Sequence, residues 1–221
     1  MKKILIPALL LAAAFAGNVQ AQSLEKMQWF NEPAEWKIVN DNKFEMVVPA
    51  QTDYWRIAHY GFTVDDAPFY YALYGGEFEA KVKITGEYVT TFDQMGLMIR
   101  QDHENWIKAG VEYVDGKQNV SAVVTHKTSD WSVVKLDKAP KSIWIKAVRR
   151  LDAVEIFYSL DDKEYTMMRT CWLKDNCPVM VGLMGACPDG KGFKAIFEDF
   201  EVKQLPDQRR LEWAKKQQTQ E

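Results

Sequence analysis

The chain has 221 residues, 47% of them hydrophobic, with 28 basic and 31 acidic side chains and a formal charge of −3. This mild acidity argues against nucleic acid as a partner, because binding to phosphates needs a basic patch. The length fits one large domain or two small ones, and all-β sandwiches of this size are commonly single domains.

The first 21 residues have the three parts of a secretory signal peptide. Lys2 and Lys3 form the positive start, the apolar stretch 4–17 follows, and Val19 and Ala21 are the small residues that signal peptidase reads. We expect cleavage after Ala21, which takes the formal charge to −5, and export to a periplasm or beyond the cell. No later apolar run approaches the ~20 residues of a membrane-spanning helix, so we expect no membrane span.

From about residue 43 onward the chain alternates apolar and polar residues between turn signals. The expected strands are 43–50, 76–86, 94–102, 106–114, 119–127, 142–151, 153–160, 178–186 and 192–205. Strands of this length with turns every eight to twelve residues or so indicate an all-β sandwich or barrel rather than βαβ units. Residues 22–205 are therefore expected to form one β domain.

The C-terminal segment 206–221 is polar and does not alternate. Glu212 and Lys216 have the i,i+4 spacing of a helical ion pair. A short polar helix and a frayed terminus both fit this segment, and the sequence leaves both open.

Three cysteines, Cys171, Cys177 and Cys187, lie near the C-terminal end. An oxidising compartment permits a disulfide, and an odd number leaves at least one thiol unpaired within a monomer. Cys171 and Cys177 could close a small loop. Cys177 and Cys187 cannot pair if an extended strand separates them, because its ends would be roughly 30 Å apart and bridged Cα atoms lie within about 7 Å.

The strands 94–102, 106–114 and 119–127 each have one apolar and one polar face. If they are neighbours, the shared core face consists of Leu97, Ile99, Ile107, Ala109, Val111, Val120, Ala122 and Val124. The opposite face then carries Arg100, Trp106, Lys108, Glu112, Ser121 and Thr125, and the expected loop 128–132 adds Ser129, Asp130 and Trp131.

Such a face suits a sugar, because aromatic rings pack on pyranose faces while charged groups hydrogen-bond hydroxyls. The predicted ligand-binding residues are Arg100, Trp106, Lys108, Glu112, Thr125, Ser129, Asp130 and Trp131. A glycosidase would need a second carboxylate beside Glu112, for which Asp130, Asp102 and Glu79 are candidates. The competing interpretation is a face of ordinary cross-strand ion pairs, each contributing about 0.2–1 kcal/mol.

The central block resembles the family called domain of unknown function 1349, also named the regulation-of-enolase family. The matching elements are Asp93-Gln94, Gly96 to Arg100, Trp106-Ile107-Lys108, Gly110, Glu112-Tyr113, Val124-Thr125 and Ser129-Asp130-Trp131. The stretches 52–55, 158–169 and 182–202 are also similar to the family, so the resemblance spans about residues 27–203. One departure is Cys187, where the family pattern has Ser before Pro188.

The resemblance implies a concanavalin A-like jelly roll, a sandwich of two antiparallel sheets whose concave sheet usually holds the ligand. That fold is shared by lectins, glucanases and lyases, so it does not define an activity. The leading hypothesis is an exported carbohydrate-binding or carbohydrate-processing accessory protein. The alternatives are a glycoside hydrolase with Glu112 as acid or nucleophile, and a structural or interaction domain with no small ligand.

The remaining functional signals are weak. The sequence contains no nucleophile-elbow, phosphate-loop, dinucleotide or zinc-protease motif, and His59, His103 and His126 lack metal-ligand spacing. We therefore expect neither a cofactor nor a metal, and favour a non-catalytic role. The identity of the sugar, the oligomeric state and any bound calcium stay open.

Overall fold

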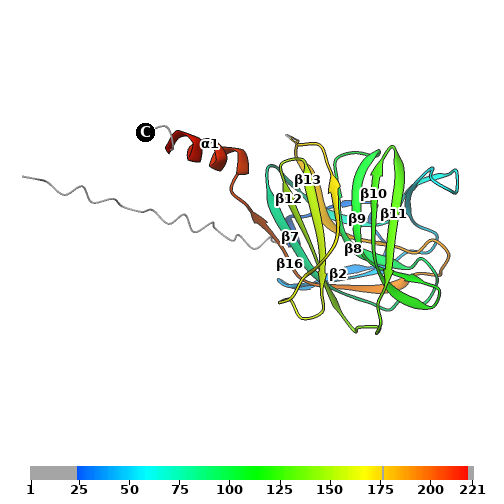
Figure 1. Cartoon of the computed structure of the whole chain (residues 1–221). Helices are drawn as coiled ribbons and strands as arrows, with labels where there is room; N and C mark the ends of the chain where they lie inside the picture. Colours follow the sequence, from blue (N-terminus) through cyan, green and yellow to red (C-terminus); the bar gives the residue numbers. More distant parts are fainter. Residues whose placement is uncertain (1–23, 176, 219–221) are drawn as a thin grey trace, which may run out of the picture.

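The computed structural model describes residues 24–175 and 177–218, so the expected signal peptide lies outside the described residues. Two seven-stranded antiparallel sheets form a sandwich (Figure 1). The strands of sheet 1 are, in spatial order, β1 (Gln28–Phe30), β6 (Phe69–Tyr74), β15 (Val179–Ala186), β8 (Gln94–Arg100), β9 (Asn105–Val114), β10 (Lys117–His126) and β11 (Thr128–Lys135). Those of sheet 2 are β14 (Thr166–Trp172), β13 (Ala153–Ser159), β12 (Ile143–Arg150), β7 (Phe78–Gly86), β16 (Phe193–Gln204), β3 (Lys43–Val48) and β2 (Trp36–Asn40).

The main hydrophobic core lies between the two sheets, because successive side chains of a strand point to opposite faces. The core face expected for β8, β9 and β10 is confirmed, with all eight of its residues buried in this cluster. Sheet 2 supplies the opposing side chains, among them Phe78, Ala80, Val82 and Ile84 of β7. The expected all-β sandwich of two antiparallel sheets is thus the observed fold.

Three smaller elements lie outside the two sheets: a 3₁₀ turn (Leu24–Lys26), the hairpin of β4 (Tyr54–Arg56) and β5 (Thr63–Asp65), and α1 (Gln208–Gln218). α1 extends away from the sandwich (Figure 1). Its first residue is tied to the body by a hydrogen bond from the Gln208 amide to the Glu77 carboxylate at 3.0 Å. The C-terminal segment is therefore helical; the side chain of Lys216, expected to pair with Glu212, lies outside the described residues.

One expectation about the sheet is wrong. The segment 128–132, expected as a loop, is the first half of β11, which pairs with β10 along its whole length. Lys127 alone joins the two strands, in a left-handed conformation with φ of 65°. A turn of this kind lacks the Gly, Pro or Asn that usually marks a hairpin.

All three cysteines are free thiols in the structure. The loop-closing disulfide between Cys171 and Cys177 that the sequence permitted is not formed. β15 runs between Cys177 and Cys187 and holds them at opposite ends of a strand.

Candidate functional site

The strand register places the predicted polar face on the outer side of sheet 1. Trp106 of β9 lies opposite Arg100 of β8 and Thr125 of β10, and Lys108 lies opposite Val123. Val123 in turn faces Trp131 of β11. Because side chains opposite one another in a sheet share a face, the predicted residues of β8, β9 and β10 come together, and Ser129 and Trp131 join them.

The β4–β5 hairpin covers half of this face. Its residues pack on sheet 1 in a second apolar cluster, separate from the main core, that includes Tyr54, Trp55, Phe69, Met98, Trp106 and Val123. Burial of this apolar surface holds the hairpin against the sheet. The face is therefore not the exposed surface that its polar composition suggested.

Arg100 anchors the hairpin through charge. Its guanidinium makes two parallel hydrogen bonds to the carboxylate of Asp65 in β5, the longer pair of atoms being Nη2 and Oδ2 at 2.6 Å. It also lies over the rings of Phe30 and Tyr54, at 4.5 and 5.8 Å from their centres. Only 3% of the Arg100 side chain is exposed, so this forked geometry matches the arrangement in which a buried arginine pairs best.

Three other predicted ligand residues are also buried under the hairpin. Trp106 is 1% exposed and touches the edge of the Tyr54 ring. The hydroxyls of Thr125 and Ser129 are hydrogen-bonded at 2.9 Å, and Ser129 accepts the amide of Arg56 in β4 at 2.9 Å. These side chains hold the hairpin and do not line an open site.

The other half of the face is hollowed into a cavity of about 260 Å³. Five aromatic side chains, five polar ones, a proline and a valine line it: Trp55, Tyr60, Phe62, Phe92, Trp131, Asp53, Gln94, Lys108, Glu112, Asp189, Pro188 and Val123. Tyr60 and Phe62 are about half exposed and stack on each other with ring centres 5.6 Å apart, so they form a rim. An aromatic wall around a few converging polar groups is typical of a ligand pocket.

Lys108 is the basic group of the described cavity lining, and two of its three ammonium donors are used within the protein. Its ammonium donates to the Tyr54 carbonyl at 2.7 Å and to the Asp53 carboxylate at 3.2 Å. The same Asp53 oxygen accepts the Tyr54 amide at 2.7 Å and is 3.4 Å from the amide of Gln94. Lys108 thereby ties the start of β4 to the middle of sheet 1.

Glu112 lies next to this pair on β9 and is 5% exposed. One of its carboxylate oxygens, Oε2, accepts the Ser121 hydroxyl at 2.6 Å and the Trp131 indole at 2.8 Å. Burial raises the pKa of Glu112 above its ordinary value, against the opposing effect of the Lys108 ammonium and these two hydrogen bonds. The Glu112 carboxylate, which lies in the cavity floor, thus fixes the Trp131 ring in the cavity wall.

Small residues lie in the cavity floor beside Lys108 and Glu112. Gly96 of β8 lies opposite Gly110 of β9, which lies opposite Ser121 of β10. A Cβ atom on Gly110 would meet the Met95 carbonyl oxygen at 1.9 Å, so the two strands approach closely only because the side chain is absent. Gly110 and Ser121 line a further small void that shares Gln94, Lys108 and Glu112 with the main cavity.

The candidate second carboxylates lie elsewhere. Asp130 alternates with Trp131 along β11, so it points to the opposite side of the sheet, where it pairs with Arg169 of β14 at 3.0 Å. Asp102 caps the turn between β8 and β9 and accepts the amide of Asn105 at 2.9 Å. Glu79 belongs to β7 in sheet 2. None of the three is among the described residues that line the cavity.

The carboxylates that do line the cavity with Glu112 are Asp53 and Asp189, which the sequence did not reveal as site residues. Neither did it reveal Trp55, Tyr60, Phe62, Phe92 or Gln94. The usable signal was the aromatic density of the stretch 54–62, which lacks strand alternation. The overlapping stretch 52–55 is similar to the family, but the similarity alone does not identify a site.

No group of three or more metal-ligating side chains comes together within residues 24–175 and 177–218. No helix in the described part of the chain is long and apolar enough to cross a membrane.

Comparison with known proteins identifies the family of this chain. Residues 29–205 match the model described as "Protein of unknown function (DUF1349)". The chain belongs to this family. Its relative "Regulation of enolase protein 1" of Saccharomyces cerevisiae is 30% identical over 186 residues, covering 83% of this chain and 93% of the relative. The DUF1349 match thus includes every element that builds the cavity.

Solved structures share the fold of this DUF1349 protein. A functionally unknown protein from Saccharomyces cerevisiae matches with a TM-score of 0.80 and 30% identity, over 84% of this chain and all of the other. A variant of the GH43 protein BlXynB from Bacillus licheniformis has a TM-score of 0.66 at 15% identity, over 85% of this chain and 38% of the other. The carbohydrate-binding module CBM66 from Bacillus subtilis has 0.50 at 14%, over 81% and 98%. At these lower identities the likeness shows the fold alone.

Proposed function

We propose that the protein is exported and binds carbohydrate in the cavity beside the β4–β5 hairpin. The observation that carries the proposal is the lining: five aromatic side chains surround a floor of Lys108, Glu112, Asp53 and Gln94. Aromatic faces pack against the C–H faces of a pyranose, while carboxylate, ammonium and amide groups satisfy its hydroxyls. Two proteins that share this sandwich fold, a GH43 protein and a carbohydrate-binding module, support carbohydrate as the ligand class by analogy.

The proposal divides the predicted ligand residues into two groups and leaves out Asp130, which pairs with Arg169 on the other side of the sheet. Lys108, Glu112 and Trp131 contact the sugar. Arg100 acts indirectly by holding the hairpin that carries Trp55, and the same holds for Trp106, Thr125 and Ser129. The third hypothesis from the sequence, a structural domain with no small ligand, thus fits the covered half of the face and not the hollowed half.

Titration calorimetry against a panel of plant, fungal and bacterial oligosaccharides tests the proposal. Phe62→Ala removes an exposed rim ring, so it leaves the core intact and should weaken binding at least about tenfold, a typical loss for a stacked aromatic contact. Trp172→Ala is the matched control, because Trp172 is an exposed aromatic of β14 in sheet 2. No binding to any saccharide, or equal affinity in both variants, would reject the proposal.

Export is tested separately. The mature protein recovered from the native host should begin at Gln22, which N-terminal sequencing or intact mass measurement would show. A mature chain that keeps residues 1–21 would reject this part of the proposal.

A second candidate is a glycoside hydrolase with Glu112 as the general acid. Burial raises the pKa of Glu112, as a general acid requires, and Asp53 lines the same cavity as a second carboxylate. Against this role, the Asp53 oxygen that faces Lys108 is already occupied by three donors. Release of reducing ends from a bound oligosaccharide, abolished in Glu112→Gln, would establish hydrolysis; binding without release would exclude it.

A further inference from the structure

We infer that the carbohydrate in the cavity carries a free amino group, so that the ligand is an amino sugar in its ammonium form. This inference rests on the proposed function, because it names the class of sugar. Its basis is a charge imbalance in the cavity lining together with a carboxylate oxygen of Glu112 that accepts no hydrogen bond from the described residues.

The charged lining of the cavity consists of Asp53, Glu112, Asp189 and Lys108, three acids and one base. Lys108 is matched by Asp53, whose carboxylate lies 3.2 Å from its ammonium. Lys108 also acts on the charge of Glu112, but as the one base of the described lining it leaves an excess of two acids. A uronic acid or a sulfated sugar would bring its negative charge against these two carboxylates, and like charges placed together cost several kcal/mol in a recognition site.

Of the two carboxylates Glu112 and Asp189, Glu112 gives the stronger evidence. It is 95% buried, and its Oε2 atom accepts both the Ser121 hydroxyl and the Trp131 indole. Its Oε1 atom accepts no hydrogen bond from the described residues, although the side chain lines the cavity. Oε1 is not among the buried polar atoms that lack a partner, so it can be reached from the cavity, and an ammonium offers it three donors and the opposite charge.

The surrounding rings favour the same chemistry. Trp55, Phe92 and Trp131 form the wall, and Tyr60 and Phe62 form the rim. The negative face of an aromatic ring attracts a cation, and it does so more strongly where water is excluded. One enclosure can therefore pack against the apolar face of a pyranose and stabilise an ammonium attached to it.

Three trisaccharides that share a β-1,4-linked backbone test the inference, because they differ only in the group at carbon 2: amine in the glucosamine trimer, acetamide in the N-acetylglucosamine trimer, and hydroxyl in cellotriose. Calorimetry at mildly acidic pH, where the amines are protonated, and at low salt should show the amine binding at least about tenfold more tightly than either neutral sugar, the usual scale of one added charge-assisted hydrogen bond. Equal or tighter binding of a neutral trimer overturns the inference and leaves the proposed function standing. No binding by any of the three also overturns it, while the wider oligosaccharide panel decides the proposed function.

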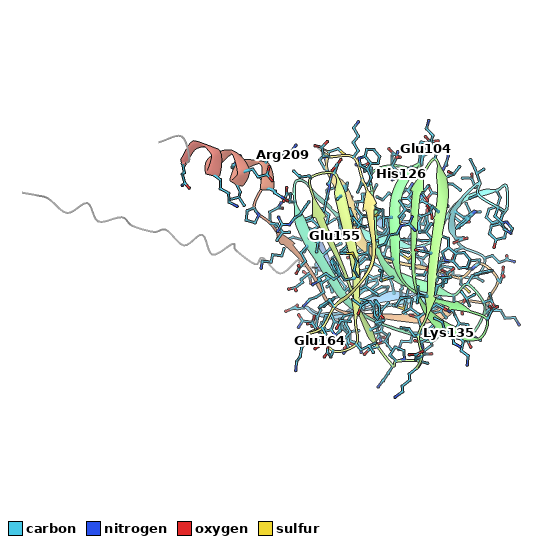
Figure 2. All side chains as sticks on the ribbon, in the orientation of Figure 1. Glu104, His126, Lys135, Glu155, Glu164 and Arg209 are labelled. Carbon is cyan, nitrogen blue, oxygen red and sulfur yellow. The ribbon has the colours of Figure 1, made fainter. Side chains whose placement is uncertain are left out.

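Variants connect the preference to the carboxylate. Glu112→Gln keeps the size and the acceptor for Ser121 and Trp131, so it should bring the affinity of the glucosamine trimer down to that of cellotriose. Glu155→Gln removes the same charge from β13 in sheet 2 (Figure 2) and should leave the preference unchanged. A preference that survives Glu112→Gln would overturn the assignment.

A last experiment distinguishes an amino sugar from an amine without a sugar ring. Nα-acetyl-lysine amide carries a primary ammonium without a pyranose. It should bind at least about tenfold more weakly than the glucosamine trimer, because it lacks the sugar ring that packs on the aromatic wall. Comparable affinity would show that the cavity selects an ammonium alone, and would overturn the assignment of an amino sugar.

Discussion

Replacement of Asp65 by Asn should loosen the hairpin that closes half of the site. The substitution keeps the shape of the side chain but removes the charge opposite Arg100, whose side chain is 3% exposed and whose Nε atom already lacks a partner. Breaking a fully buried pair costs 3–5 kcal/mol or so. Because Asp65 is 28% exposed, and because the rings of Phe30 and Tyr54 still flank the guanidinium, we expect a loss of about 2–3 kcal/mol.

For a domain of this size that loss corresponds to a fall in melting temperature of about 4–12 °C, which differential scanning calorimetry measures directly. The matched control is Glu104→Gln at the end of the same sheet (Figure 2). Glu104 also ties the hairpin, through Arg56 at 2.9 Å, but its side chain is 36% exposed, so its loss should cost less than about 1 kcal/mol. Equal melting temperatures for the two variants would refute the assignment of Arg100 and Asp65 as the anchor.

Three further changes test the floor of the cavity. Gly110→Ala puts a Cβ atom against the Met95 carbonyl and should cost about 1–3 kcal/mol of unfolding free energy by urea denaturation. Lys108→Met removes the ammonium between Asp53 and Tyr54 and should lower both the urea midpoint and the affinity for sugar. Glu112→Gln should change the pH dependence of stability: the folded pKa of Glu112 is raised above the unfolded value of 4.5, so the stability that this carboxyl contributes at low pH is lost as the pH rises through its folded pKa. The unfolding free energy of the variant should therefore increase relative to that of the wild type as the pH rises above 4.5.

Each of these has a clear contrary result. Full stability in Gly110→Ala would mean that the two strands can separate without cost. Unchanged affinity in Lys108→Met would remove Lys108 from the ligand site. A constant difference in unfolding free energy between Glu112→Gln and the wild type from about pH 4 to pH 8 would mean that the carboxyl titrates at its ordinary value in the folded protein.

Nine strands could be predicted, because strand alternation is a local property, whereas β1, β2, β6 and β14 were missed. Ile107 and Val111 fall on one side and Trp106 and Lys108 on the other whatever the rest of the chain does, so the shared faces of the three central strands could be predicted. The resemblance to the family then supplied the sandwich. By contrast, β11 follows a single turn residue, Lys127, and its alternation is short, so the sequence pattern does not distinguish it from a loop.

The cavity could not be predicted, because a long-range contact creates it. The β4–β5 hairpin is a pair of three-residue strands that pairs with neither sheet, and it packs on sheet 1 through Trp55 and Tyr54. Without that contact, Arg100 and Lys108 look equally available to a ligand. The hairpin buries Arg100 and leaves Lys108 at the floor of the cavity, and no periodicity in the sequence distinguishes the two.

The central claim is that a sugar occupies the aromatic cavity, and the tryptophan indole signals of an ¹H–¹⁵N NMR spectrum test it most directly. Trp55 and Trp131 line the cavity, whereas Trp144 and Trp172 lie on sheet 2. Titration with a bound oligosaccharide should shift the signals of Trp55 and Trp131 and leave those of Trp144 and Trp172 in place. Shifts confined to Trp144 or Trp172, or no indole shift with any oligosaccharide, would contradict the account.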